Sequence, residues 1–217
     1  MTDVDPSVEA IGKLSPSQLV ELLEQLDPTS DRLEQVDIDA IGRAIDPTAL
    51  RSGEFRTLLE QVDRLAGAGA GVDLSRMGAQ TFARLIGRAS KEQLSEVLAK
   101  PGLRARILGE IFRRMQEHLR AEKAHSVDTV VHWRFTDGTG DGGYDRYETA
   151  IDHGVCATTD EQTRPARVTI TIGPYDFLRL VTSNASAPVL FMTGKLKVRG
   201  DLAFAASMMG LFDLPRA

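Results

Sequence analysis

The chain has 217 residues, of which 42% are hydrophobic and 26% charged, values that are ordinary for a globular protein. The formal net charge of -5 is unevenly distributed. Residues 1–102 contain 11 Lys or Arg and 17 Asp or Glu, a net of -6, whereas residues 103–217 contain 15 and 14, a net of +1. Neither half has the positive excess typical of a nucleic-acid-binding protein, so we expect no nucleic-acid partner.

The cysteine content and the two ends of the sequence restrict the class of protein and its expected location in the cell. The single Cys156 excludes a disulfide within the chain and supplies no thiolate pair for a metal site. The N-terminal stretch is acidic and lacks the apolar run of a secretory signal, and no stretch has transmembrane length. The final residues are not a peroxisomal signal of the Ser-Lys-Leu type. We therefore expect a cytoplasmic protein, and a bacterial origin fits that expectation.

Residues 1–102 have the pattern of an all-helical region, because apolar residues recur at helical spacing between short breaks. The stretch 66–71, which alternates Ala and Gly, is expected to be a flexible connector. One expected helix begins at Ser15-Pro16, and another runs from about 31 to 44. Further helices carry the apolar stripes Phe55 to Leu65 and Met77 to Ile86, and one more starts at Ser90.

A weak internal similarity links the starts of these helices. The segment 15–19 (Ser-Pro-Ser-Gln-Leu) resembles 90–94 (Ser-Lys-Glu-Gln-Leu), and 46–50 is a poorer third copy. A helical repeat in a small stacked bundle would explain this, and so would the general similarity of helix N-caps. The acidic surface of this half is either simply solvated, or it docks a protein partner or a second copy, or it covers the other half.

Residues 103–217 combine a long helix with strands in which apolar and polar residues alternate. The Gly-rich stretch 137–143 is expected to form a hairpin turn. The predicted helix runs from Leu103 to Lys123, and the predicted strands are Val127–Phe135, Tyr144 to about His153, Val155–Thr159 and Val168–Ile172.

The most informative stretch is near the C-terminus. From Lys195 to Arg199, charged residues alternate with Leu196 and Val198, which is the period of a half-buried strand. Gly200 ends this strand.

An almost wholly apolar run from Leu202 to Phe212 follows, with Asp201 as a suitable N-cap. At about 11 residues the run is too short to span a bilayer. A helix that is apolar on all sides must meet apolar surroundings, so this one is either a core helix or the wall of an apolar cavity.

The residues from Met192 to Asp201 (Met-Thr-Gly-Lys-Leu-Lys-Val-Arg-Gly-Asp), followed by this apolar run, resemble the closing segment of sterol carrier protein 2 (SCP-2) sterol-transfer domains. Upstream, the strand 168–172 (Val-Thr-Ile-Thr-Ile) leads into 173–180 (Gly-Pro-Tyr-Asp-Phe-Leu-Arg-Leu), as in that family. The resemblance covers roughly residues 103–217. It implies a lipid-binding domain with an apolar tunnel under a curved sheet and no chemistry of its own.

The expected fold is α+β, with a five-stranded, mostly antiparallel sheet covered by helices (SCP2-like) in residues 103–217 and an all-α region in residues 1–102. The resemblance implies non-catalytic binding or transfer of a fatty acid, fatty acyl-CoA, phospholipid or sterol, with transient membrane contact and no cofactor. The side chains expected to contact the ligand are Val131, Trp133, Phe135, Phe177, Leu180, Leu190, Phe191, Met192, Leu196, Val198, Phe204, Met208, Met209, Leu211 and Phe212. The alternatives are an interaction or regulatory scaffold and an accessory domain that presents lipid to a separate enzyme.

Several polar residues invite a catalytic or metal-binding interpretation, but none completes a pattern. The stretch 137–141 begins like a calcium loop and lacks the spaced Glu ligand. His132 and His153 lie on adjacent predicted strands without a third ligand. Cys156 has no evident His or Asp partner, and a small buried residue is its expected role. We therefore expect no catalytic residue and no metal site.

Overall fold

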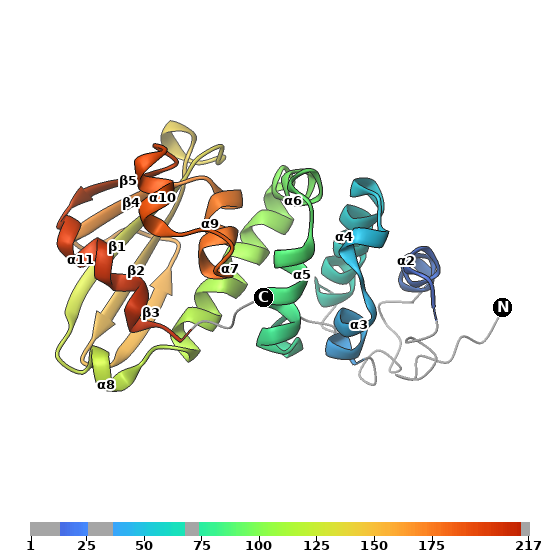
Figure 1. The fold of residues 1–217 in the computed structure, drawn as a ribbon, viewed down its shortest axis with the longest axis horizontal. Coiled ribbons are helices and arrows are strands. Elements are labelled where there is room, and N and C mark those ends of the chain that lie inside the picture. Colours follow the sequence, from blue (N-terminus) through green and yellow to red (C-terminus); the bar gives the residue numbers. More distant parts are fainter. Residues whose placement is uncertain (1–13, 26–36, 68–73, 214–217) are drawn as a thin grey trace. The chain divides into compact units, whose positions relative to one another are not determined.

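The computed structural model describes residues 14–25, 37–67 and 74–213. The chain divides into two compact units, with the boundary between Arg104 and Ala105. Figure 1 shows that the described part of the first unit is built from helices and that the second combines a sheet with helices. The expected α+β fold with a preceding helical region is thereby confirmed.

The first unit contains five helices in its described residues. Two predictions fall partly outside the described residues, namely the start of the helix 31–44 and most of the connector 66–71. The helices are α2 (Pro16–Gln25), α3 (Ile38–Ala44), α4 (Ser52–Gly67), α5 (Ala79–Arg88) and α6 (Lys91–Leu98), with 3-10 turns at Pro47–Ala49 and Leu74–Arg76.

The two Ser-x-x-Gln segments of this unit form the same capping box. The Ser15 hydroxyl accepts from the Gln18 backbone N–H at 3.3 Å, and the Gln18 side chain accepts from the Ser15 N–H at 2.8 Å. Ser90 and Gln93 repeat this at 3.1 and 2.7 Å. The buried Gln93 amide also donates to two backbone carbonyls of the turn 47–50, so it ties α6 to that turn. The similarity of the two segments therefore includes a shared helix cap.

The second unit contains the sheet and its covering helices. One prediction is wrong here: the helix expected to reach Lys123 starts at Pro101 and ends at Glu117. The elements are α7 (Pro101–Glu117, which begins before the unit boundary), α8 (Ala121–Ala124), β1 (Asp128–Phe135), β2 (Asp145–Asp152), β3 (Val155–Thr159), β4 (Val168–Ile172), α9 (Pro174–Val181), α10 (Ala187–Met192), β5 (Leu196–Gly200), α11 (Leu202–Met208) and a 3-10 turn at Met209–Leu211.

Helix α7 ends because the following backbone pairs with the end of the chain. The Arg120 N–H donates to the Leu211 carbonyl, and the Asp213 N–H donates to the His118 carbonyl, both at 2.8 Å. Leu119 and Phe212 form the bridge between the two segments. This long-range pairing replaces the next helical turn.

The five strands form one sheet in the order β3-β2-β1-β4-β5. All neighbours are antiparallel except β1 and β4, which are parallel. Trp133 lies opposite Tyr147 on β2 and Ile170 on β4. Burial alternates along β1 and β4, so one sheet face carries the apolar side chains, as the period of two predicts.

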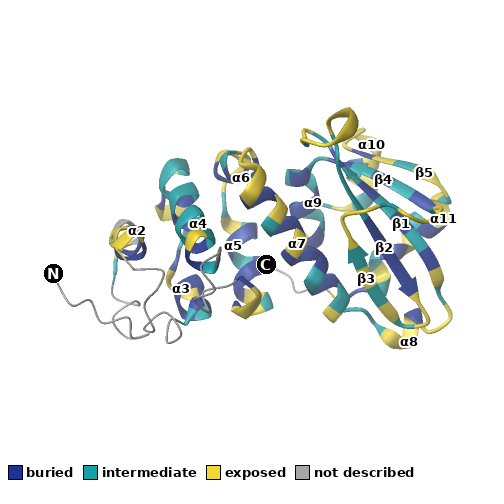
Figure 2. Ribbon diagram, turned by 180° about the vertical axis from the view of Figure 1, so that it is seen from behind, coloured by how far each residue is buried: buried dark blue, intermediate teal, exposed yellow. Residues whose placement is uncertain are grey.

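The core of this unit is an aromatic cluster on that face. The Phe112 ring of α7 lies 4.9 Å from Tyr147, 5.7 Å from Trp133 and 5.7 Å from Phe177 on α9, measured between ring centroids. Phe135 lies 5.0 Å from Phe177. Figure 2 shows buried residues in β1 and β2 and more exposed ones towards β5 and α11. The packing is therefore complete around Phe112 and looser at the β5 end.

Helix α11 is attached at its first turn. Gly200 has a φ of 102°, and a Cβ there would meet the Arg167 carbonyl oxygen at 2.4 Å, so the close approach requires glycine. Asp201 caps the helix by accepting from the Phe204 N–H at 2.8 Å, which confirms the predicted N-cap. The Arg167 guanidinium pairs with Asp201 at 2.7 Å and stacks 4.5 Å above the Phe204 ring.

Candidate functional site

A cavity of about 280 Å³ lies between the strands β1, β4 and β5 and the helices α9, α10 and α11. Its lining contains apolar residue types throughout, so it offers a ligand dispersion contacts and desolvation rather than charge. The lining residues are Trp133, Ile170, Leu180, Ala187, Pro188, Phe191, Leu196, Val198, Leu202, Ala205, Ala206, Met208 and Met209.

The structure brings about half of the predicted ligand contacts together at this cavity. They come from strands β1 and β5, from helices α9, α10 and α11, and from the turn after α11. The parallel pairing of β1 with β4 and the antiparallel pairing of β4 with β5 place the two strands in one sheet. These residues are Trp133, Leu180, Phe191, Leu196, Val198, Met208 and Met209.

Four other predicted contacts are core residues that do not line the cavity. Val131, Phe135 and Phe177 are fully buried, and Leu190 is 3% exposed. Phe135 and Phe177 belong to the aromatic cluster around Phe112, where protein atoms surround them. Their apolar character serves the interior of the domain.

The remaining four predicted contacts lie elsewhere for separate reasons. Phe204 packs under the Arg167 guanidinium, and Leu211 and Phe212 belong to the segment that pairs with residues 118–120. Met192 is 84% exposed at the end of α10.

Sequence reasoning missed six lining residues. Ile170 alternates with polar residues along its strand, as the predicted contact Val198 does along β5, and Leu202 opens the apolar run, so both had a usable signal. The four small residues gave none, because an Ala or Pro lines a cavity only where larger neighbours leave the space. They are Ala187, Pro188, Ala205 and Ala206.

The cavity reaches the protein surface along one side. Phe191 and Leu202 line it and are also 45% and 53% exposed. Leu180 and Val198 also line the cavity and are only half-buried. An apolar ligand could therefore enter the cavity between α10 and the start of α11.

Trp133 presents its ring to the cavity with its polar group already satisfied. The indole N–H donates to the Thr149 hydroxyl at 3.0 Å, and the Thr149 and Thr158 hydroxyls are 2.9 Å apart. Because the donor is paired on the sheet, the indole needs no partner from a ligand.

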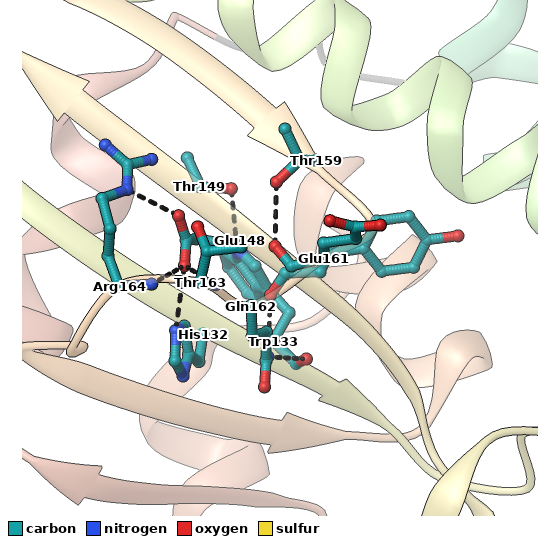
Figure 3. A network of polar contacts seen from close by, with 10 residues as sticks. His132, Trp133, Glu148, Thr149, Thr159, Glu161, Gln162, Thr163 and Arg164 are labelled. Atoms are coloured by element: carbon teal, nitrogen blue, oxygen red, sulfur yellow. Dashed lines mark hydrogen bonds and ion pairs between the residues drawn. The ribbon is translucent and has the colours of Figure 1, made fainter.

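A polar network fixes the connector between β3 and β4 (Figure 3). Glu148 is 1% exposed and accepts from the backbone N–H groups of Thr163 and Arg164, both at 2.9 Å. The Arg164 Nε donates to the same carboxylate at 2.7 Å, and His132 Nε2 lies 3.3 Å from it. Burial alone raises the pKa of Glu148, but these hydrogen bonds outweigh it and lower the pKa to about 2. The network is a structural clamp made of satisfied groups.

The other titratable residues considered from sequence do not converge. His132 pairs with Glu148, whereas His153 lies beyond β2 and pairs with Asp152, whose carboxylate raises the pKa of His153. Cys156 is half-buried, and burial raises the pKa of its thiol to about 11. In residues 14–25, 37–67 and 74–213, no three His, Cys, Asp or Glu side chains are grouped as metal ligands.

Residues 108–213 match the model of the SCP-2 sterol transfer family. This part of the chain is an SCP-2 sterol transfer domain, preceded by an N-terminal region. Domains of this lipid-transfer family are typically non-catalytic.

The chain is similar to several known proteins. Non-specific lipid-transfer protein-like 1 of Caenorhabditis elegans is 23% identical over 103 residues, which are 48% of this chain and 87% of that protein. The apo form of sterol carrier protein 2 from Yarrowia lipolytica is 22% identical, with 50% of this chain and 88% of that chain covered and a TM-score of 0.41. The sec-alkylsulfatase Pisa1 from Pseudomonas sp. is 14% identical, with 92% of this chain covered and a TM-score of 0.44. This chain spans only 32% of the sulfatase.

Within the described ranges, every helix is too short or too polar to cross a bilayer.

Proposed function

We propose that residues 103–217 bind and transfer a lipid whose hydrocarbon part occupies the cavity beside Trp133, without catalysing a reaction. The observation that carries this proposal is the apolar lining, which comes from strands and helices alike and opens to solvent at Phe191 and Leu202. Burying hydrocarbon there contributes about 25 cal/mol per Å² of apolar surface removed from water. The family match to residues 108–213 supports the same reading.

The size of the cavity favours a slender ligand. Its volume of about 280 Å³ is slightly below the roughly 300–1,000 Å³ typical of small-molecule pockets. A single flexible acyl chain suits that space better than a rigid ring system. Among fatty acid, fatty acyl-CoA, phospholipid and sterol, we therefore favour ligands that insert one acyl chain and keep the head group outside.

A cytoplasmic location and a bacterial origin stay predictions.

Filling the cavity with a side chain tests the proposal. Ala205 lines the cavity, whereas Ala203 lies on the exposed side of the same helix and does not line it. We expect Ala205→Phe to weaken fatty-acid binding by at least about tenfold, because the ring takes the space of several methylene groups. Ala203→Phe adds the same ring to the same helix and is expected to bind as the unaltered protein does. Titration with a fluorescent fatty acid measures both.

The result also separates the alternatives. Equal affinity for the two variants would mean that the acyl chain binds elsewhere. If neither the two variants nor the unaltered protein binds the fatty acid, an interaction or regulatory scaffold would be favoured. Extraction and mass spectrometry of lipid from the purified protein then distinguishes a filled site from an empty one.

A further inference from the structure

The sheet of the second unit has one face towards the cavity and one face away from it. Trp133, Ile170, Leu196 and Val198 line the cavity. Successive side chains of a strand point to opposite faces, so the residues that alternate with these four point away from the cavity. We call this second face the outer face of the sheet.

The outer face carries four cationic side chains. Strand pairing arranges its residues in rows that run across β2, β1, β4 and β5. One row is Arg146, Arg134, Thr171 and Lys197, and the next is Glu148, His132, Thr169 and Arg199. We define the basic face as Arg134, Arg146, Lys197 and Arg199.

The charge of the basic face is not compensated within the chain. None of its four residues forms an ion pair with another residue that the structure describes. Arg146 donates only to the backbone carbonyl of Asp141, at 3.0 Å, and the buried Nε of Arg134 has no hydrogen-bond partner in the described ranges. Like charges directly opposite each other destabilise a sheet, and Arg134 and Arg146 are such a pair.

The acidic residues of the outer face do not neutralise this charge. Glu148 is buried and accepts from Arg164 and from two backbone N–H groups (Figure 3). Asp128 and Asp152 lie opposite each other at the far end of β1 and β2, where Asp152 contacts His153. The basic face therefore offers its charge to a partner outside the domain.

The first unit supplies a helix of opposite charge. Helix α2 contains Glu21 and Glu24 and no Lys or Arg, and both glutamates are exposed and without an ion pair among the described residues. They are three residues apart, so they lie on one side of the helix with Cβ atoms about 5–6 Å apart. Residues directly opposite on antiparallel strands have Cβ atoms about 4.5–5.5 Å apart. The spacing of the two glutamates thus matches that of Arg134 and Arg146.

We propose that two copies of this chain associate through helix α2 of one copy and the basic face of the other. Charge complementarity selects a second copy, because residues 1–102 have a net charge of -6 and carry the matching helix. An open sheet face suits a macromolecular surface, whereas small ligands bind in concave sites. Two reciprocal contacts related by a two-fold axis would close the assembly as a dimer. The inference does not depend on the proposed lipid ligand.

Charge reversal on each side of the contact tests this. The face variant is Lys197→Glu/Arg199→Glu, and the helix variant is Glu21→Lys/Glu24→Lys. All four residues are exposed, and none lines the cavity, so folding and fatty-acid binding are expected to be unchanged. Self-association of the full chain is measured by sedimentation velocity at about 0.01 M and about 0.15 M salt.

A control variant changes the net charge as the face variant does. It is Lys91→Glu/Lys123→Glu, in which two exposed lysines outside the basic face are reversed. We expect the unaltered protein and the control to associate at low salt and about tenfold more weakly at the higher salt. The face variant alone and the helix variant alone are each expected to associate about tenfold more weakly than the unaltered protein at low salt.

Mixing the two variants is the sharpest arm of the test. The helix variant then offers a basic α2 to the acidic face of the face variant, and the remaining helix and face are unaltered, so association is expected to return to its original strength. No association of the unaltered protein, equal loss in the control, or no recovery on mixing would overturn the proposal. Loss in the face variant without loss in the helix variant would overturn the role of α2.

Discussion

At the scale of single residues, the buried charge of Glu148 is compensated by several hydrogen-bond donors. Its side chain is 1% exposed, and two backbone N–H groups and the Arg164 guanidinium donate to it. A buried carboxylate is tolerated only when such donors replace water. The connector between β3 and β4 is therefore held across the sheet by the ionised form of this residue.

This clamp predicts a defined loss of stability in acid. The pKa of Glu148 is lowered from 4.5 to about 2 in the folded protein, so the unfolded chain binds its proton first. The contribution of Glu148 is thus present above about pH 4.5 and is lost as the pH falls towards about 2. At pH 7 we expect Glu148→Gln to lower the free energy of unfolding by about 1–3 kcal/mol. Urea unfolding at several pH values measures this.

Comparing Glu148→Gln with the unaltered protein separates the titration of Glu148 from that of the other carboxylates. The difference in unfolding free energy between the two proteins is expected to shrink between about pH 4.5 and about pH 2. A difference that stays constant over this range would show that Glu148 does not titrate as the hydrogen bonds require.

The sequence identified the apolar residues, but it did not show whether each side chain points into the core or into the cavity. Phe177 and Phe191 are both apolar residues on short helices, and only Phe191 lines the cavity, because Phe177 packs against Phe112. Phe204 is capped by Arg167, a residue 37 positions away along the chain. The contact of Arg167 with Phe204 depends on the register of β4 with β5, which no local pattern specifies.

At the scale of elements, the attachment of α11 decides whether one wall of the cavity is in place. The helix follows β5 directly, and its first turn is held by the Asp201 cap and the Arg167–Asp201 pair. Gly200 lets the backbone approach the Arg167 carbonyl. Five lining residues belong to α11 and the turn after it, so a shift of this segment would distort the cavity.

Two glycines with positive φ provide a matched pair of variants. Gly200→Ala adds both backbone strain and a clash with the Arg167 carbonyl oxygen at 2.4 Å. Gly194→Ala, at a φ of 72°, adds strain but no neighbour within 4 Å. We expect Gly194→Ala to lower the free energy of unfolding by about 1–2 kcal/mol and Gly200→Ala to lower it by about 3 kcal/mol or more. Urea unfolding compares them, and equal losses would argue against the close approach.

Elements with a clear period were predictable, and those set by long-range pairing were not. Strand β4 has its predicted bounds because polar and apolar residues alternate along it. Strand β3 also has its predicted bounds, although its residues do not alternate in this way. Helix α10 was not among the predicted elements, because six residues are too few to show a helical period. The predicted helix ran past Glu117 because Leu119 continued its apolar stripe, although the backbone there pairs with Phe212.

At the scale of the whole molecule, charge differs between the two halves of the sequence. Residues 1–102 have a net of -6, and residues 103–217 have a net of +1. The helical unit has its own buried apolar residues, including Leu23, Phe55, Leu65 and Val97. A role in docking a protein partner, in forming a homodimer or in covering the lipid domain stays a prediction for residues 1–102.

The central claim is that an acyl chain occupies the cavity beside Trp133, and this residue is a built-in reporter. It is the single tryptophan of the chain, it lines the cavity, and it is 1% exposed. A bromine atom quenches indole fluorescence only at short range, so a brominated fatty acid reports contact with that ring alone.

The decisive measurement is the fluorescence of the full chain during titration with a brominated fatty acid, with aqueous iodide as the control quencher. The account predicts saturable quenching at one fatty acid per chain, reversal by the unbrominated acid and little quenching by iodide. Binding of the fatty acid without quenching of Trp133, or no binding at all, would contradict it.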